Sequence, residues 1–580
     1  MTKTRPPFNF ATLFALGTLA GISFLRATWE PNEGELSRVI KDGDFASYSS
    51  AASAWLGARL PNNPDQITEA TIKELIKDPR VIQLLEQQQI LAIVKPDQVA
   101  TFAKANPANP QFLHWLFSSP KVMEMFLQAT GPTAIAERDA NRYTIPVETL
   151  TIWASIKRTD PDTQEGLYEK LAMATAIAPP GSRTGGAGGG KPSIPQPLER
   201  YLHYKSAHQK HELFPSFDRL TVWEYTKVVC CHASNEDLTW AREMINTWRP
   251  DLRINERVVE STREVWRRNS PWLYTDGFKS VLSGGGKCGP RSSWAVMICQ
   301  AFGIPAIGVG QPAHACVAAK TAFPELPPQA GSAWKVHQGM GWDVTRIDGT
   351  RGPEFLEAMA ERAQPAAFDE IERLRWLATS LANKNQADAV RGLIGKFRKS
   401  LSLNTILTPT ESPSDPNVEG VAKTSAPAFT QQATIAEPPF PQIPGTIHIE
   451  AEDFSKSFAE PVFPLEQKGV VFVLDCHSGG KQLNLQKNMQ TCWVEYPINV
   501  PSAGNYQMIA RTAVVNTEQI LDVSQGDTKL ATINIPNAYG LWTTSAPVEV
   551  KLEKGPQTLR VSTPAQRGMA IRWFELKQSQ

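Results

Sequence analysis

The sequence is poor in cysteine and in net charge, and each shortage excludes a class of protein. Seven cysteines among 580 residues are too few for a disulfide scaffold, although Cys476 and Cys492 lie close enough in one C-terminal region to pair in an oxidising compartment. The formal net charge is only +1, so nothing favours nucleic acid as a partner. The adjacent Cys230 and Cys231 lack a partner at metal-ligand spacing, so we expect no zinc site there. We predict no cofactor for the protein, apart from the structural calcium considered below.

Long apolar runs are also scarce, and the one present lies at the N-terminus. Lys3 and Arg5 precede an apolar run from Phe8 to Leu25, which is the pattern of a secretory signal. We therefore expect residues 1–27 to be a signal peptide or an uncleaved N-terminal anchor, which would be the only link to a membrane. The protein is expected to be exported, to the periplasm, the cell envelope or the extracellular space.

Two segments rich in proline and small residues divide the chain. Residues 181–197 carry a glycine run between prolines, and residues 406–445 are rich in Pro, Ser and Thr. They predict linkers between a domain at 30–180, a central domain at 198–405 and a strand-rich module at 446–580. The first domain is expected to be all-α, because residues such as Ile72, Leu75 and Ile76 recur at helical spacing.

Cys288 is the best candidate for chemistry. It follows the glycines at 284–286, and Pro290 has the backbone angle of a first helical turn, so a helix is expected to begin beside the sulfur. The positive end of the helix dipole favours the thiolate, which is the nucleophilic form. The alternative is a buried structural cysteine.

Short strands are predicted after this helix, which makes the central domain α+β. The strands are expected at Ala306–Gly310, at His314–Ala319, at Ala333–His337 and at Gly341–Val344. If the helix packs on the sheet, His314 can accept the thiol proton of Cys288, and Asp343 on a neighbouring strand can orient the imidazole.

These residues resemble a known family. Gly286-Lys287-Cys288-Gly-Pro-Arg, the helix end Phe302-Gly-Ile-Pro-Ala306, His314-Ala315 and Gly341-Trp342-Asp343 are similar to the transglutaminase-like superfamily of papain-like fold. The resemblance implies that Cys288 is the nucleophile, His314 the general base and acid, and an aspartate the orienting residue. The enzyme would be a cysteine protease, amidase or acyltransferase with a peptide or amide substrate.

The sequence departs from that family at the third residue. The family places its aspartate a few residues beyond the tryptophan, whereas Asp343 follows Trp342 directly and Asp348 lies further on. His337 is a rival for His314, but it falls in mid-strand.

The C-terminal module alternates apolar and polar residues in several segments, which predicts an antiparallel β-sandwich. It resembles carbohydrate-binding modules of families 6 and 35, through Glu450-Ala-Glu452, Trp493 with Tyr496, Pro501-x-x-Gly504-x-Tyr506, Gly540-Leu-Trp542 and Ile571-Arg-Trp-Phe574. The resemblance implies a jelly roll of the galactose-binding-like type that binds polysaccharide or glycoprotein. The expected sugar-binding residues are Asn537, Tyr539 and Trp542, although Trp542 is equally consistent with a core residue.

The same resemblance implies a structural calcium near Glu450 and Glu452. The family's aspartate before the closing aromatic residue is Arg572 here, which offers no anionic oxygen.

Taken together, these features predict an exported modular protein with a glycan-binding module and a thiol site that acts on amide or acyl bonds. The alternative is a non-enzymatic glycan-binding envelope protein whose central domain is degenerate.

Overall fold

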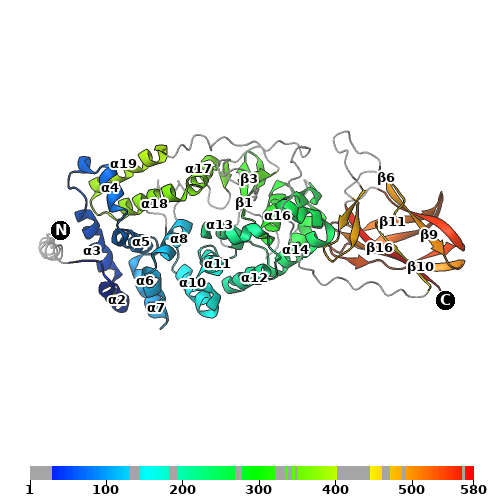
Figure 1. The fold of residues 1–580 in the computed structure, drawn as a ribbon, viewed down its shortest axis with the longest axis horizontal. Helices are drawn as coiled ribbons and strands as arrows, with labels where there is room; N and C mark the ends of the chain where they lie inside the picture. The colour runs from blue at the N-terminus through cyan, green and yellow to red at the C-terminus, as the bar shows by residue number, and fades with distance from the viewer. Residues whose placement is uncertain are drawn as a thin grey trace, which may run out of the picture. The chain divides into compact units, whose positions relative to one another are not determined.

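The structure is a computed structural model that describes residues 29–130, 144–181, 194–267, 277–320, 334–337, 343–345, 350–400, 445–459, 471–485, 491–564 and 568–579. The expected signal or anchor, most of both expected linkers and Asp348 lie outside these residues. The described residues divide into two compact units. Figure 1 labels many of the helices and strands of both. The first comprises the described residues up to 177 together with 221–223 and 354–400, and the second comprises the remaining described residues.

The first unit is helical, as predicted for the N-terminal part of the chain. Helices that follow residue 353 belong to it as well, whereas the sequence prediction assigned them to the central domain at 198–405. Its elements are α2 (Glu33–Asp42), α3 (Phe45–Ala58), η1 (Pro64–Gln66), α4 (Glu69–Leu75), α5 (Pro79–Val94), α6 (Pro96–Ala105), α7 (Asn109–Phe117), α8 (Pro120–Thr130), α10 (Glu148–Thr159), η3 (Pro161–Gln164), α11 (Gly166–Ile177), α17 (Gly352–Arg362), α18 (Pro365–Ser380) and α19 (Lys384–Ser400).

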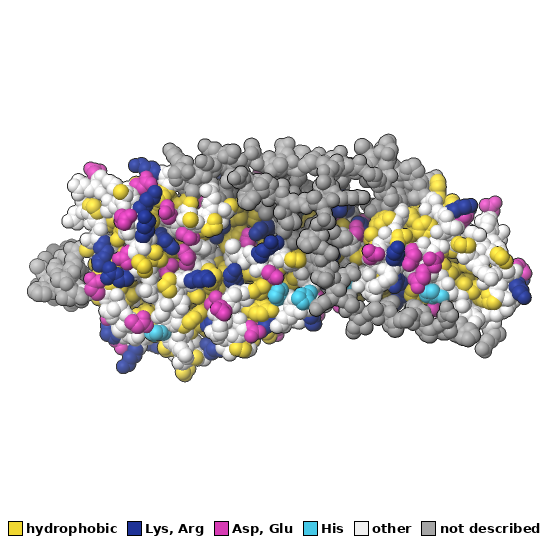
Figure 2. All heavy atoms as spheres, viewed as in Figure 1, with side chains coloured by type: hydrophobic (Ala, Val, Ile, Leu, Met, Phe, Trp, Pro, Cys, Tyr) yellow, Lys and Arg dark blue, Asp and Glu magenta, His cyan; other side chains and the backbone are white. Residues whose placement is uncertain are grey.

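Local sequence explains where these helices begin and what they bury. Asp78 caps α5 by accepting from the Arg80 N–H, and Pro79 follows at a position where no N–H is needed. Trp153 is fully buried and stacks on Phe126 with ring centroids 5.3 Å apart. On the side of the molecule drawn in Figure 2, basic and acidic side chains are interspersed over the N-terminal helices.

The second unit begins with helices and a small antiparallel sheet. The helices are α12 (Pro197–Gln209), η4 (Pro215–Arg219), α13 (Val222–Val229), α14 (Asn235–Trp248), η5 (Pro250–Glu264), α15 (Gly277–Gly284) and α16 (Cys288–Ala301). The strands are β1 (Ala306–Gln311), β2 (His314–Lys320), β3 (Trp334–His337) and β4 (Val344–Thr345), in the order β3-β2-β1-β4. Helix α16 packs on β1 and β2.

The predicted β-sandwich is confirmed. Its strands are β5 (Thr446–Glu450), β6 (Lys456–Ala459), β7 (Val471–Asp475), β8 (Lys481–Leu485), β9 (Cys492–Val500), β10 (Gly504–Val514), β11 (Gln519–Gln525), β12 (Thr528–Ile535), β13 (Thr543–Thr544), β14 (Val548–Leu552), β15 (Gly555–Thr563) and β16 (Met569–Gln578). One sheet has the order β13-β10-β16-β8-β7, with β14 on β10 and β5 on β16. The other has the order β12-β11-β15-β9-β6.

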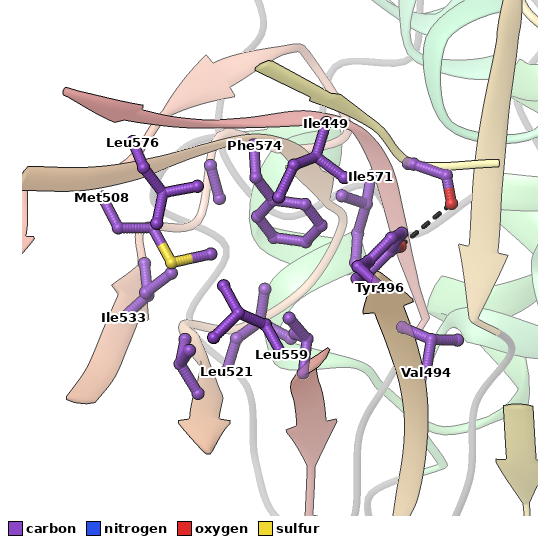
Figure 3. Close-up of a cluster of buried hydrophobic side chains, with 14 of the residues drawn as sticks. Ile449, Val494, Tyr496, Met508, Leu521, Ile533, Leu559, Ile571, Phe574 and Leu576 are labelled. Atoms are coloured by element: carbon purple, nitrogen blue, oxygen red, sulfur yellow. Dashed lines mark hydrogen bonds between the residues drawn. The ribbon is translucent and has the colours of Figure 1, made fainter. Parts of the chain in front are cut away.

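Alternate residues of both sheets form one core between them, which Figure 3 shows. Tyr496 and Phe574 meet edge to face with centroids 5.4 Å apart. The Tyr496 hydroxyl donates to the Ala451 carbonyl at 2.9 Å, so its polar end is satisfied inside the core.

The seven cysteines all lie in described segments and form no disulfide there, Cys476 and Cys492 included. None of the helices in the described ranges has the length and apolar character needed to cross a bilayer.

Candidate functional site

The glycine run holds the beginning of α16 against a neighbouring segment. Gly285 has φ +77°, and a Cβ there would lie 2.4 Å from the Trp266 carbonyl oxygen. The Gly286 N–H donates to that same oxygen at 2.8 Å. Only glycine fits this approach, and it brings Lys287 to the N-cap and Cys288 to the first helical position. The predicted helix start beside Cys288 is confirmed, and the Cys288 side chain is partly exposed.

His314 and Asp343 lie on the two sides of the end of β1. His314 is the first residue of β2 and pairs with Gln311. The Asp343 N–H donates to the Gly310 carbonyl at 3.0 Å. Both side chains are exposed. The sequence predicted an aspartate on the strand next to the histidine, whereas the structure places β1 between β2 and β4.

A second thiol, Cys316, ties these residues to α16. Burial raises the pKa of Cys316 to about 11, and nearby Cys288 and Asp343 add to the effect. The Ser292 hydroxyl, one turn along α16 from Cys288, donates to the Cys316 carbonyl at 2.5 Å. Cys316 and His314 are two residues apart in a strand and so share one side of the sheet. His314 is therefore on the side of β2 that Cys316 shares with Cys288.

The rival histidine lies on the other side of the sheet. His337 is directly opposite Val317 in the register of β2 and β3. Directly opposed residues project to the same side, and Val317 alternates with Cys316. His337 therefore projects away from the side that carries Cys316 and His314.

Arg291 is a further charged group near the sulfur that the sequence prediction did not use. Burial and nearby Arg267 lower the pKa of Arg291, while Cys288 acts in the opposite direction. The Cys-Gly-Pro-Arg motif already contained this arginine, because position i+3 on a helix lies beside position i.

The predicted sugar loop packs with its backbone against α14. The Tyr539 carbonyl accepts from the Trp240 indole N–H at 3.0 Å, and the Asn537 side chain accepts from the Tyr539 N–H at 3.0 Å. Gly540 has φ +79°, and a Cβ there would lie 2.4 Å from Met244 Cγ. Asn537, Tyr539 and Trp542 all keep partly exposed side chains.

The five-stranded sheet β12-β11-β15-β9-β6 carries an aromatic surface that the sequence prediction missed. Phe458 on β6 is 44% exposed and stacks on Trp493 of β9 with centroids 5.8 Å apart. The Arg560 guanidinium lies 4.4 Å from the Trp493 ring centroid, and its Nη2 donates to Glu495 Oε1 at 2.7 Å. We call Phe458, Trp493, Glu495 and Arg560 the sheet-face platform.

Strand register continues this surface with polar groups. Trp493 pairs with Ser562, Ser562 with Asp522, and Asp522 with Thr532, so these side chains form one row across the sheet. The sequence did contain a signal for this surface, namely the alternation of inward and outward side chains along a strand. Val494 and Tyr496 are core residues of a strand with period two, so Trp493 must point outward.

The implied calcium does not fit the described residues. Glu452 Oε2 is buried without a hydrogen-bond partner, and Glu450 Oε1 lies 3.1 Å from His448 Nε2. The Arg572 guanidinium donates to the Lys481 carbonyl and brings a positive charge to this region. Within the described ranges, no group of three or more His, Cys, Asp or Glu side chains could hold a metal ion.

The comparisons with known proteins concern the sandwich. No protein-family model and no curated protein matches the chain. Among solved structures, the C-terminal family-6 carbohydrate-binding module of a marine laminarinase from Zobellia galactanivorans is 25% identical, with a TM-score of 0.20 over 23% of this chain and 99% of that one. A module from a Cellvibrio mixtus lichenase in complex with cellotriose is 23% identical, with a TM-score of 0.19 over 23% and 98%. A family-35 module from Clostridium thermocellum is 18% identical, with a TM-score of 0.18 over 23% and 98%. All three of these solved structures are carbohydrate-binding modules, and they match the C-terminal part of the chain.

Proposed function

We propose that the chain is an exported modular protein whose sandwich binds a glycan and whose central domain carries a transglutaminase-like thiol site. The observation that supports glycan binding is the sheet-face platform. Exposed aromatic rings bury the C–H surface of a pyranose, while neighbouring fixed charges and hydroxyls bond to its hydroxyl groups. Phe458 and Trp493 supply the rings, and Glu495 and Arg560 supply the polar groups. The loop residues Asn537, Tyr539 and Trp542 are the second candidate surface.

The platform is tested with the full chain on laminarin, cello-oligosaccharides and xylan by isothermal titration calorimetry. Trp493→Ala is expected to weaken binding at least about tenfold, the effect of losing ~1.4 kcal/mol of stacking. Val473→Ala is the matched control, because Val473 is 37% exposed on the other sheet and should bind as the wild type does. A loss confined to Trp542→Ala would move the site to the loop, and no binding of any probe by the wild type would refute the glycan proposal.

The thiol site is proposed to act on amide or acyl bonds. His314 takes the Cys288 proton, the sulfur bonds to the carbonyl carbon, and the C–N bond breaks as His314 returns the proton to the leaving amine. Water or a second amine then releases the acyl group from the thioester. The N-terminus of α16 and Arg291 place positive charge near the reacting sulfur.

This proposal is tested by alkylation with iodoacetamide at pH 6 and pH 7.5, with the labelled residues identified by mass spectrometry. Cys288 should label fastest, and His314→Ala should slow it about tenfold or more, because no imidazole is then present to accept the thiol proton. His337→Ala is the control, since His337 projects from the other side of the sheet. Labelling of Cys288 no faster than that of a free model thiol would favour the non-enzymatic alternative.

A further inference from the structure

The sandwich contacts the central domain through a defined set of residues. Helix α14 contacts β10 and β16, and η5 contacts β7. On the sandwich, the contact involves two side chains of β8 and three loop positions between the strands. We call these residues the docking surface: Gln482, Asn484, Asn516, Tyr539–Gly540 and Gly568.

The side chains of β8 cap the C-terminus of α14. The Asn484 amide donates to the Trp248 carbonyl at 2.7 Å, and the Gln482 amide donates to the Thr247 carbonyl at 3.0 Å. The last carbonyls of a helix have no partner within the helix, so these bonds satisfy groups that would otherwise need water. Gln482 and Asn484 are buried, with exposed fractions of 0% and 1%. Undocking would expose both ends of these bonds.

Loops of the sandwich extend the contact. Asn516 donates to the Glu264 carbonyl at 3.0 Å and is itself 2% exposed. Gly540 leaves room for Met244, and a Cβ at Gly568 would lie 3.3 Å from the Trp248 ring. Such directional bonds between buried groups specify one docked arrangement.

One docking bond lies next to the helix that carries the nucleophile. Trp240 donates its indole N–H to the Tyr539 carbonyl, and its ring meets Trp294 edge on with centroids 5.8 Å apart. Trp294 is a fully buried residue of α16, the helix that begins at Cys288. The sandwich, α14 and α16 are therefore in continuous contact through two tryptophans.

We propose that the docked sandwich is a working part of the central domain, and that Trp240 is a positioning residue which couples docking to the placement of α16 and of Cys288. The inference rests on the proposed thiol function. A linker would allow the sandwich to tether the domain without contact. The buried hydrogen bonds from the Gln482 and Asn484 side chains instead make docking a condition for the reactivity of the thiol.

The experiment uses the full chain and removes the docking hydrogen bonds while a bulky side chain remains at each position. Gln482→Leu with Asn484→Leu eliminates the donors to α14, and Trp240→Phe removes the indole N–H but keeps an aromatic ring beside Trp294. We expect amide exchange in the last turn of α14 to accelerate about tenfold or more in the double variant. Alkylation of Cys288 should slow about 2- to 30-fold in both variants, and its pH profile should shift to higher pH.

The matched control is Gln525→Leu with Gln557→Leu. These changes remove an exposed hydrogen bond of 3.1 Å between two amide side chains on the other sheet. It should change neither readout. Faster exchange with unchanged labelling of Cys288 would overturn the coupling while leaving the thiol function intact. A wild-type Cys288 no more reactive than a model thiol would overturn the thiol function and this inference with it, and unchanged exchange would show that the amides do not hold the sandwich.

Discussion

At the scale of the residue, the most unusual group is Glu86 of α5. It is 1% exposed, and burial together with nearby Glu124 raises its pKa to about 9, although Arg373 opposes the shift. One of its oxygens, Oε2, is buried without a hydrogen-bond partner. Glu86 is therefore protonated in the folded protein at neutral pH, whereas an exposed glutamate would be ionised.

This predicts a pH-dependent stability of the helical unit. Between pH 4.5, the ordinary value, and about 9, the folded state holds a proton that the unfolded state releases, so stability falls as pH rises, by up to about 1.4 kcal/mol per unit. Glu86→Gln should remove this loss and stabilise the unit by at least about 1 kcal/mol at pH 8, with little effect at pH 4. Amide exchange in α5 measures it. Glu74→Gln, at an exposed glutamate, should show no such dependence, and an equal gain at both pH values would contradict the protonated state.

The sequence does not reveal Glu86 as buried. It stands in a run of glutamines, Gln87 to Gln89, which has the composition of a solvated helix surface, yet all of them are buried. Helical periodicity depends on apolar residues, so a helix that is buried on its polar side as well gives no local signal. The helix start beside Cys288 was predictable, because the glycine run and Pro290 act on the local backbone.

At the scale of the element, the limits of α16 and the first strands were predictable from local rules. The helix runs from Cys288 to Ala301, and Gly303 after it has φ +80° in a space bounded by Phe217. The strand that begins at His314 is also confirmed. The place of β4 was not predictable, because the choice of neighbouring strand depends on contacts between distant parts of the chain.

The glycine before α16 makes a second prediction at this scale. Gly285→Ala would put a methyl group 2.4 Å from the Trp266 carbonyl oxygen and force a side chain into a left-handed conformation. We expect a loss of at least about 1 kcal/mol of stability and slower alkylation of Cys288. Differential scanning calorimetry and the labelling rate measure both effects. Gly289→Ala is the control, because nothing lies within 4 Å of a Cβ there. Equal effects of the two substitutions would disprove the argument from close approach.

At the scale of the whole molecule, the kinds of structure were predictable and their grouping was not. The sequence indicates helices, then mixed elements, then strands, and the structure has them in that order. It also attaches α18 to the N-terminal helices, where Asp369 accepts from Gln128 at 2.8 Å and Arg373 lies 3.3 Å from Glu124. These bonds join residues far apart in the sequence, and periodicity says only that each helix has a buried side.

Docking of the sandwich was hidden for the same reason. Gln482 and Asn484 alternate with Leu483 and Leu485, which is the pattern of a strand with one solvent-exposed face. The structure buries both sides of β8, because α14 covers the amides. A polar residue in a strand therefore marks either solvent or a partner of matching polarity, and alternation alone does not separate the two.

The buried amides of β8 also limit how far this sandwich can serve as an exchangeable cassette. Transplanted to another protein, it would keep the core between its sheets, because every residue of that core is its own. Its Gln482 and Asn484 side chains would nevertheless lose the helix carbonyls that accept their hydrogen bonds here. A transfer that keeps these side chains hydrogen-bonded must therefore include α14. The segment that can be moved as a unit is larger than the β-sandwich alone.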